Sequence, residues 1–126
     1  MTAYWTEAEL WRRIEEAAGD REVFREGLRE LDEPELRSLH LQLCRLAEAL
    51  VRECFDRLPP EAREEDVLNL EERALWVVAR GRDRYEAVRA DPSIFPSREE
   101  ARGRSFASAV IASYTSRFGP FQALER

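Results

Sequence analysis

Apolar positions recur every three to four residues through most of the chain, which is the spacing of one face of an α-helix. The longest such run covers residues 33–58. Its apolar and weakly polar positions occupy a broad arc of the helical projection: Leu36, Leu39, His40, Leu43, Ala47, Leu50, Val51, Cys54 and Leu58, with Leu41, Leu46 and Phe55 widening it further. A helix with so wide an arc is contacted by neighbours on more than one side. We therefore expect residues 33–58 to form the central helix of a bundle.

Capping residues mark the ends of the predicted helices. Thr6 with Glu9, and Asp32 with Glu35, have the spacing of a capping box, and Asp20 follows a glycine as an N-cap. The principal helices expected are one from Thr6 through Ala18, a short one after Asp20, 33–58, 70–90 and 97–118. No alternating run of β-branched and polar residues indicates a strand. The chain is therefore predicted to be a single all-α domain, 1–126, built as a compact bundle of about five helices.

The predicted helix 70–90 has two features that its periodicity does not explain. Gly81 lies near its middle, where glycine costs about 1 kcal/mol relative to alanine, so we expect it to permit close approach of another helix. Trp76 lies on the side opposite the apolar stripe. That position indicates one of two arrangements. Either Trp76 is an exposed interface residue, or the helix is packed on two sides and the segment Tyr4-Trp5 lies over Trp76.

The predicted last helix has two different faces. Ser97 with Glu100 indicates its start, and Gly119-Pro120 indicates its end. The stripe expected to be buried consists of Phe106, Val110, Ile111, Tyr114 and Phe118. The other face is small and uncharged: Ser105, Ser108, Ala109, Ala112 and Ser116. Such a face admits a partner helix or packs within the domain, and the pattern favours neither.

Composition narrows the class of protein. The chain has 26 acidic residues and 20 basic ones, and its net charge of −6 argues against a nucleic-acid-binding protein, which presents a basic surface. Neither a signal peptide nor an apolar run of ~20 residues is found, so we expect a cytoplasmic protein with no membrane interaction. Cys44 and Cys54 would lie about 15 Å apart on one helix. This separation is too large for a disulfide, and both thiols are expected to be reduced.

Residues 75–86, followed by Asp91-Pro92, combine a tryptophan-containing apolar run, the pair Gly81-Arg82 and an aromatic residue, Tyr85, three positions on. This pattern resembles the best-marked part of a bacterial family, domain of unknown function 4240, and the likeness extends over about 15–95. Members of that family often carry a Gly-rich turn with two adjacent aspartates before the tryptophan helix. This chain departs from it there, at residues 64–69. The resemblance implies an α-helical fold and no particular mechanism.

His40 and Cys44 are the pair with the spacing that catalysis would need. Four residues apart on a helix, they share a face one turn apart. A thiolate beside an imidazolium is a reactive nucleophile, and both side chains can ligate zinc. The alternative is a hydrogen-bonded histidine and a packing cysteine in the apolar arc of the central helix. Zinc needs three or four protein ligands, and the chain has one histidine and two cysteines. We therefore predict neither a metal site nor a cofactor.

A second group of candidates surrounds Trp76. Arg80 lies one turn from it, and an exposed Trp–Arg pair is typical of protein interfaces. The basic residues that follow can hold a phosphate or a carboxylate, or they can pair with the acids around them. These basic residues are Arg80, Arg82, Arg84 and Arg89, and the acids are Asp83, Glu86, Asp91 and Glu71 or Glu72. The binding residues that we predict are Trp76, Arg80, Arg82, Arg84 and Tyr85.

These observations favour a non-catalytic helical module, accessory or regulatory, that binds another protein or a second copy of itself as a homo-oligomer. Gly-rich phosphate loops, His-Glu zinc motifs and serine nucleophile elbows are missing from the sequence, so no motif supports an enzyme. The alternative is a small-molecule-binding protein or enzyme with a pocket between helices 33–58 and 70–90. The residues expected to line that pocket are His40, Cys44, Trp76, Arg80 and Tyr85.

Overall fold

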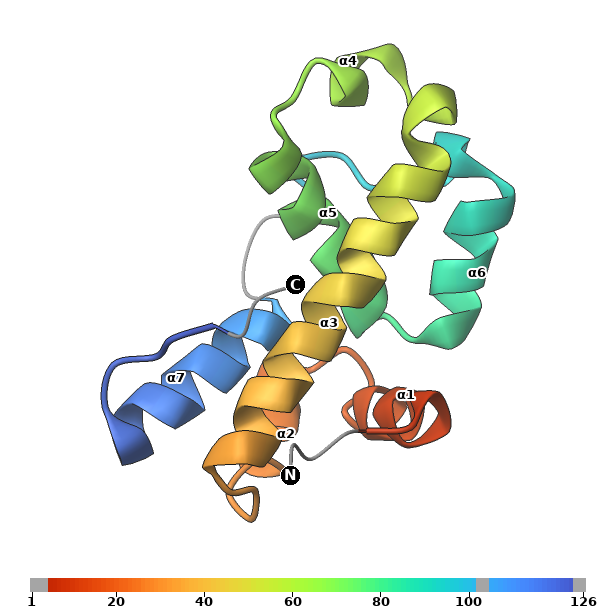
Figure 1. The fold of residues 1–126 in the computed structure, drawn as a ribbon. Helices are drawn as coiled ribbons and strands as arrows, with labels where there is room; N and C mark the ends of the chain where they lie inside the picture. The colour runs from red at the N-terminus through yellow and green to blue at the C-terminus, as the bar shows by residue number, and fades with distance from the viewer. Residues whose placement is uncertain (1–4, 102–104, 124–126) are drawn as a thin grey trace.

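The computed structural model describes residues 5–101 and 105–123, and the regular elements in these ranges are all helices. In chain order they are α1 (Glu7–Glu16), α2 (Arg21–Glu26), α3 (Glu33–Cys54), the 3₁₀ helix η1 (Phe55–Arg57), α4 (Pro60–Arg63), α5 (Val67–Ala79), α6 (Arg82–Ala90), the 3₁₀ helix η2 (Pro92–Ile94) and α7 (Phe106–Phe118). Figure 1 shows them gathered around α3. The predicted all-α bundle with a long central helix is confirmed. Within the two described ranges, no helix combines the length and the apolar character needed to cross a membrane.

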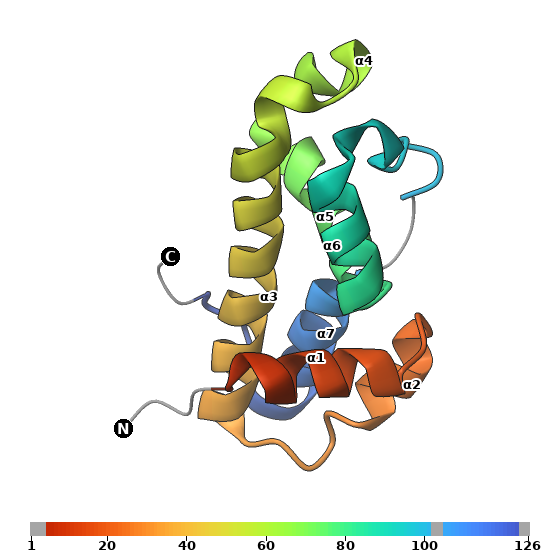
Figure 2. The same ribbon diagram turned by 90° about the vertical axis from the view of Figure 1, so that its right-hand side faces the viewer.

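The central helix α3 begins where the sequence predicts. Asp32 Oδ1 accepts a hydrogen bond from Glu35 N (2.9 Å), and Glu35 Oε1 accepts one from Asp32 N (3.0 Å), which completes the capping box. The α-helix ends at Cys54, and the chain continues through η1, so it is slightly shorter than predicted. The predicted apolar arc is buried except at its widened edge, where Leu46 is half-buried and Phe55 is 39% exposed. Because α3 packs mainly against α5 and α7, the core lies along its length (Figure 2).

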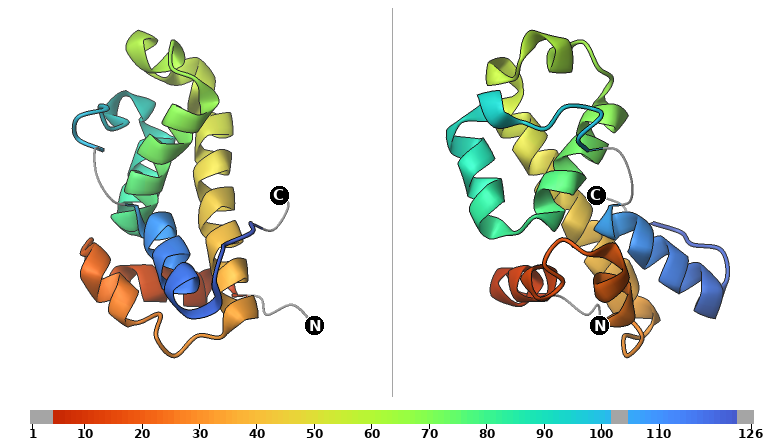
Figure 3. Two further views of the ribbon diagram at one scale, coloured as in Figure 1. Left: turned by 90° about the vertical axis from the view of Figure 1, so that its left-hand side faces the viewer. Right: turned by 180° about the vertical axis from the view of Figure 1, so that it is seen from behind.

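Two groups of helices cover the two ends of α3. Helices α1, α2 and α7 lie at one end, and α4, α5 and α6 lie at the other (Figures 1 and 3). Phe24 of α2 and Phe106 of α7 stack with their ring centroids 4.2 Å apart. Arg21 Nε also donates a hydrogen bond to Ser108 Oγ (3.3 Å), and Ala109 is buried. The small-residue face of α7 therefore packs in part within the domain, against α2.

The predicted continuous helix 70–90 is wrong, because the chain breaks it at Gly81. This residue has φ 105° and ψ 172°, a backbone conformation open almost only to glycine, and it separates α5 from α6. Gly81 has no side chain to cap α6. Instead, Glu15 Oε2 of α1 accepts a hydrogen bond from Arg82 N at 3.1 Å. The glycine thus makes a turn between two helices rather than a close helix–helix contact.

The predicted helix 97–118 is also corrected. Ser97 Oγ accepts a hydrogen bond from Glu100 N (3.0 Å), but this local cap holds only a turn. Helix α7 begins at Phe106, where Ser105 Oγ accepts a hydrogen bond from Ser108 N (3.1 Å). Residues 102–104 of the prediction lie outside the described ranges. Of the predicted buried stripe, Phe106, Val110 and Tyr114 are buried, whereas Ile111 and Phe118 are 38% and 40% exposed.

Candidate functional site

His40 and Cys44 contact each other inside the core. Cys44 Sγ lies 3.8 Å from His40 Nε2 and 4.0 Å from His40 Nδ1, as their spacing on α3 requires. Both residues are buried, at 8% and 5% exposure. The edge-on ring of Phe121 packs over His40 with centroids 4.7 Å apart, and Phe121 in turn packs on Tyr114. The two residues predicted as a nucleophile pair therefore lie beneath C-terminal aromatic side chains.

No set of three or more histidine, cysteine or acidic side chains in the described part of the chain has the arrangement to hold a metal ion. Both cysteines are buried free thiols, and burial raises the pKa of the Cys54 thiol.

Trp76 is a half-buried platform for two arginines. The guanidinium carbon of Arg80 lies 4.7 Å from the centroid of its ring, and that of Arg84 lies 5.7 Å away. Trp5 is not the cover that the sequence suggested, because its indole N–H donates to Glu35 O at the start of α3 (3.3 Å). Tyr4, the other expected cover, lies outside the described residues. Trp76 thus packs partly against the hydrophobic core and carries Arg80 and Arg84 over its ring.

The predicted basic group divides according to its partners. Arg89 Nε donates to Glu53 (2.8 Å) and Arg89 Nη1 donates to Glu86 (3.1 Å). Arg80 Nη2 donates to the backbone oxygen of Gly19 (3.4 Å). Within the described ranges neither Arg80 nor Arg84 has a carboxylate partner, and the buried Nε of Arg84 has no hydrogen bond. Pairing with neighbouring acids therefore accounts for Arg89 but leaves the charges of Arg80 and Arg84 unmatched.

Tyr85 is a structural contact of α6 rather than an exposed side chain. Its hydroxyl donates a hydrogen bond to Leu46 O on α3 (2.7 Å), and its ring lies 5.3 Å from that of Trp11. The residue is 5% exposed. This burial raises the pKa of Tyr85 to about 12. Tyr85 therefore joins α6 to α3, much as the N–H of Arg82 joins α6 to α1.

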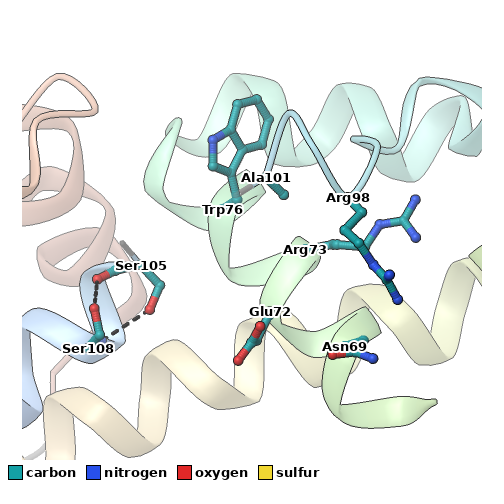
Figure 4. Close-up of a pocket in the computed structure, with 8 residues that line it drawn as sticks. All are labelled: Asn69, Glu72, Arg73, Trp76, Arg98, Ala101, Ser105 and Ser108. Atoms are coloured by element: carbon teal, nitrogen blue, oxygen red, sulfur yellow. Dashed lines mark hydrogen bonds between the residues drawn. The ribbon is translucent and has the colours of Figure 1, made fainter. Parts of the chain in front are cut away.

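A cavity of about 330 Å³ opens between α5, the start of α7 and residues 98–101. Figure 4 shows its lining, and α5 supplies one face with residues three or four positions apart. The lining residues are Asn69, Glu72, Arg73, Trp76, Arg98, Ala101, Ser105 and Ser108. An indole, charged groups and hydroxyls thus surround one volume. This volume falls at the lower end of the range of ligand sites.

Of the lining residues, sequence reasoning predicted only Trp76 as a site residue, and the most deeply buried residue that it missed is Arg73. It is 3% exposed, Nε donates to Pro96 O (2.9 Å), and Nη2 donates to Glu61 Oε1 (3.1 Å). Arg98 Nη2, on the other side of the cavity, pairs with Glu65 Oε2 at 2.6 Å. The positive charges of both cavity arginines are therefore matched by acids. One feature of the sequence could have identified Arg73: it lies within the apolar stripe of α5, where an unpaired charge would be costly.

The five residues predicted to line one pocket belong to three separate groups of contacts. His40 and Cys44 pack with Phe121, Trp76 and Arg80 stack together, and Tyr85 contacts α1 and α3. The cavity beside Trp76 contains none of the other four in its lining.

Comparison of the chain with protein-family models, with curated proteins and with solved structures finds no match. The resemblance to domain of unknown function 4240 therefore stays a prediction from residues 75–92.

Proposed function

We propose that this chain is a non-catalytic helical module that binds another protein through the surface formed by Trp76 and the neighbouring cavity. The observation that carries the proposal is the 330 Å³ cavity with Trp76 in its wall, on a helix whose opposite face is packed in the core. Tryptophan and arginine are the side chains most enriched at the energetic centres of protein interfaces. A side chain of the partner fits the cavity, and Arg80 and Arg84 extend the contact surface beyond it.

A small polar molecule is the second candidate for the same cavity. Its volume is near the lower limit for such ligands, and its lining includes polar groups from α5, α7 and the loop between α6 and α7. In this proposal the small molecule binds beside Trp76 and does not contact His40 and Cys44, which pack beneath Phe121. Both candidates require the same cavity to be open, so one cavity-filling variant tests them together.

The experiment is site-specific photo-crosslinking in the native host. A benzophenone amino acid replaces Glu72, which is exposed, lines the cavity and makes no ion pair with a described residue. Asp56, an exposed residue of η1 outside the cavity lining, is the matched control position. We expect a discrete protein adduct from position 72 that position 56 does not form, and we expect Ala101→Phe to abolish it by filling the cavity.

The same adducts from both positions, or an adduct that Ala101→Phe leaves unchanged, would contradict the proposal. Circular dichroism of Ala101→Phe checks that the variant keeps its helical content and thermal transition. Native mass spectrometry of the purified chain then separates the two candidates. A bound small molecule that Ala101→Phe removes, without any protein adduct, would favour the small-molecule function.

A further inference from the structure

We infer that Arg80 and Arg84, stacked against Trp76, form a binding site for a carboxylate, namely an acidic side chain of the partner protein. The inference rests on the proposed function, and it specifies the chemistry of the partner segment. Arg84 differs from the other arginines of comparable burial in having no ion pair within the described ranges.

Arg84 carries a partly desolvated charge that no acid in the described ranges balances. Among the described residues, six arginines are buried or half-buried, and five of them have an ion pair: Arg13, Arg21, Arg37, Arg73 and Arg89. Arg84 is the exception, and its buried Nε also has no hydrogen-bond partner in the described ranges. Buried charges are normally paired, because removing them from water is costly. An external anion that binds the accessible part of this side chain balances the charge, while the buried Nε keeps no partner among the described residues.

The backbone turn at Gly81 places the second arginine beside the first. Arg80 ends α5 and Arg84 lies in the first turns of α6, yet the guanidinium groups of both lie over the ring of Trp76. Arg80 is also held by Gly19, whose oxygen accepts from Nη2 and whose missing Cβ leaves the space that Nη1 occupies. A Cβ at that position would lie 2.9 Å from Arg80 Nη1. The guanidinium groups of Arg80 and Arg84 are therefore restrained before a ligand binds.

This arrangement suits a carboxylate. A guanidinium group that stacks on an aromatic ring keeps its N–H groups directed outward in its own plane, and it binds carboxylate oxygens through two parallel hydrogen bonds. The acid next to the site on a neighbouring helix is Glu15, whose Oε2 already accepts from Arg82 N. Asp83 lies between the two arginines in sequence and forms no ion pair with a described residue. Glu72, in the cavity wall one turn before Trp76, also forms no ion pair with a described residue. None of these three acids pairs with Arg80 or Arg84 in the described ranges, so both guanidinium groups remain available to an anion.

The net charge of −6 does not prevent this contact. Repulsion between the whole domain and an acidic segment is screened beyond about 8 Å at physiological ionic strength. Hydrogen bonds at contact distance are screened much less. We therefore expect the domain and the acidic segment to associate slowly and at a rate that depends on salt. The preference for acidic side chains should be confined to the site of Arg80 and Arg84.

The test uses NMR signals from the site itself. Two short capped peptides serve as probes, one of alternating alanine and glutamate, the other with glutamine in place of glutamate. We expect the glutamate peptide to shift the indole N–H signal of Trp76 and the Nε–H signal of Arg84 in a saturable way. We expect the glutamine peptide to leave both signals in place. Arg80→Gln and Arg84→Gln should each weaken binding about tenfold or more, because each removes charge-assisted hydrogen bonds.

Arg29→Gln is the matched control, since Arg29 is exposed and pairs only with Glu26 on its own turn of the chain. It should bind the glutamate peptide like the wild type. Equal shifts from both peptides, or full binding by Arg80→Gln and Arg84→Gln, would overturn the inference. Saturable shifts with sodium phosphate but none with the glutamate peptide would also overturn it.

The two proposals fail in different ways. A protein adduct from position 72 that persists in Arg80→Gln and Arg84→Gln overturns the carboxylate site and leaves the protein-binding function intact. Glutamate-specific shifts at Trp76 with no adduct from position 72 support the carboxylate site and contradict the protein-binding function.

Discussion

Replacing Gly81 with alanine distinguishes one continuous helix from the two helices of the structure. In a continuous helix 70–90 the substitution would stabilise the fold by about 1 kcal/mol, because alanine is the better helix former. In the structure Gly81 has φ 105° and ψ 172°, where a Cβ is strained. The two arrangements therefore predict opposite signs for the change in the free energy of unfolding.

The magnitude follows from the backbone and from the space around it. A side-chain-bearing residue in this region of φ and ψ costs on the order of 1–3 kcal/mol. An added Cβ would lie 3.4 Å from Glu15 Cγ and 3.5 Å from Glu15 Oε2, which is close to ordinary contact, so steric overlap adds little. We expect Gly81→Ala to lower the free energy of unfolding by about 2 kcal/mol. For a domain of this size the melting temperature should fall by roughly 6–10 °C.

Urea denaturation followed by circular dichroism measures this change. Gly27→Ala is the matched control, because Gly27 has φ −68° and its added Cβ would meet no atom nearer than 3.5 Å. We expect that control to be neutral or to stabilise the protein by up to about 1 kcal/mol, through the lower entropy of its unfolded chain. A Gly81→Ala protein at least as stable as the wild type, with an unchanged denaturant slope, would refute the break between α5 and α6.

Three further predictions concern buried groups. Tyr85→Phe should lower stability by about 1 kcal/mol, because a backbone carbonyl of α3 loses its donor. Since the folded pKa of Tyr85 is raised to about 12, the stability that this tyrosine contributes is complete below pH 10 and is lost as the pH rises from 10 towards 12. Urea midpoints across that range should therefore fall more steeply for the wild type than for Tyr85→Phe. Arg73→Met should cost about 2 kcal/mol and expose residues 95–101 to limited proteolysis, because the charged hydrogen bond to Pro96 O is lost. Cys44 and Cys54 should react with a thiol reagent only on unfolding, and labelling at the rate of a free thiol at neutral pH would contradict their burial.

Much of the helical architecture could be predicted because it depends on neighbours in sequence. The capping box at Asp32 and the cap at Asp20 connect residues within three positions of one another, and both appear in the structure. Of the box predicted at Thr6, the N-cap bond from Glu9 N to Thr6 Oγ1 is present, whereas the Glu9 carboxylate accepts from the Thr6 hydroxyl. Most of the predicted apolar arc is buried, since a helical period leaves few choices about which face meets the core. Contact between His40 and Cys44 follows from the same periodicity.

The candidate site could be predicted only in part. Trp76 and Arg80 are one turn apart, so their stacking was accessible to sequence reasoning, and both were named for that reason. The cavity was not accessible, because Arg73, Arg98 and Ser105 come from elements whose packing the local pattern does not specify. The role of Arg73 depends on the carbonyl of Pro96, which lies 23 positions away in the chain.

The sequence by itself determined the helical class, the central helix and most helix starts, because propensity, caps and apolar period act over one or two turns. Tertiary structure decided where helix 70–90 breaks and what surrounds Trp76. Gly81 permits both a helical backbone and the positive-φ backbone of the structure, and the contact with Glu15, 67 positions from Arg82, accompanies the positive-φ one. In the same way the sequence places Trp76 on the side of α5 opposite the apolar stripe, but only the turn at Gly81 brings Arg84 back over its ring.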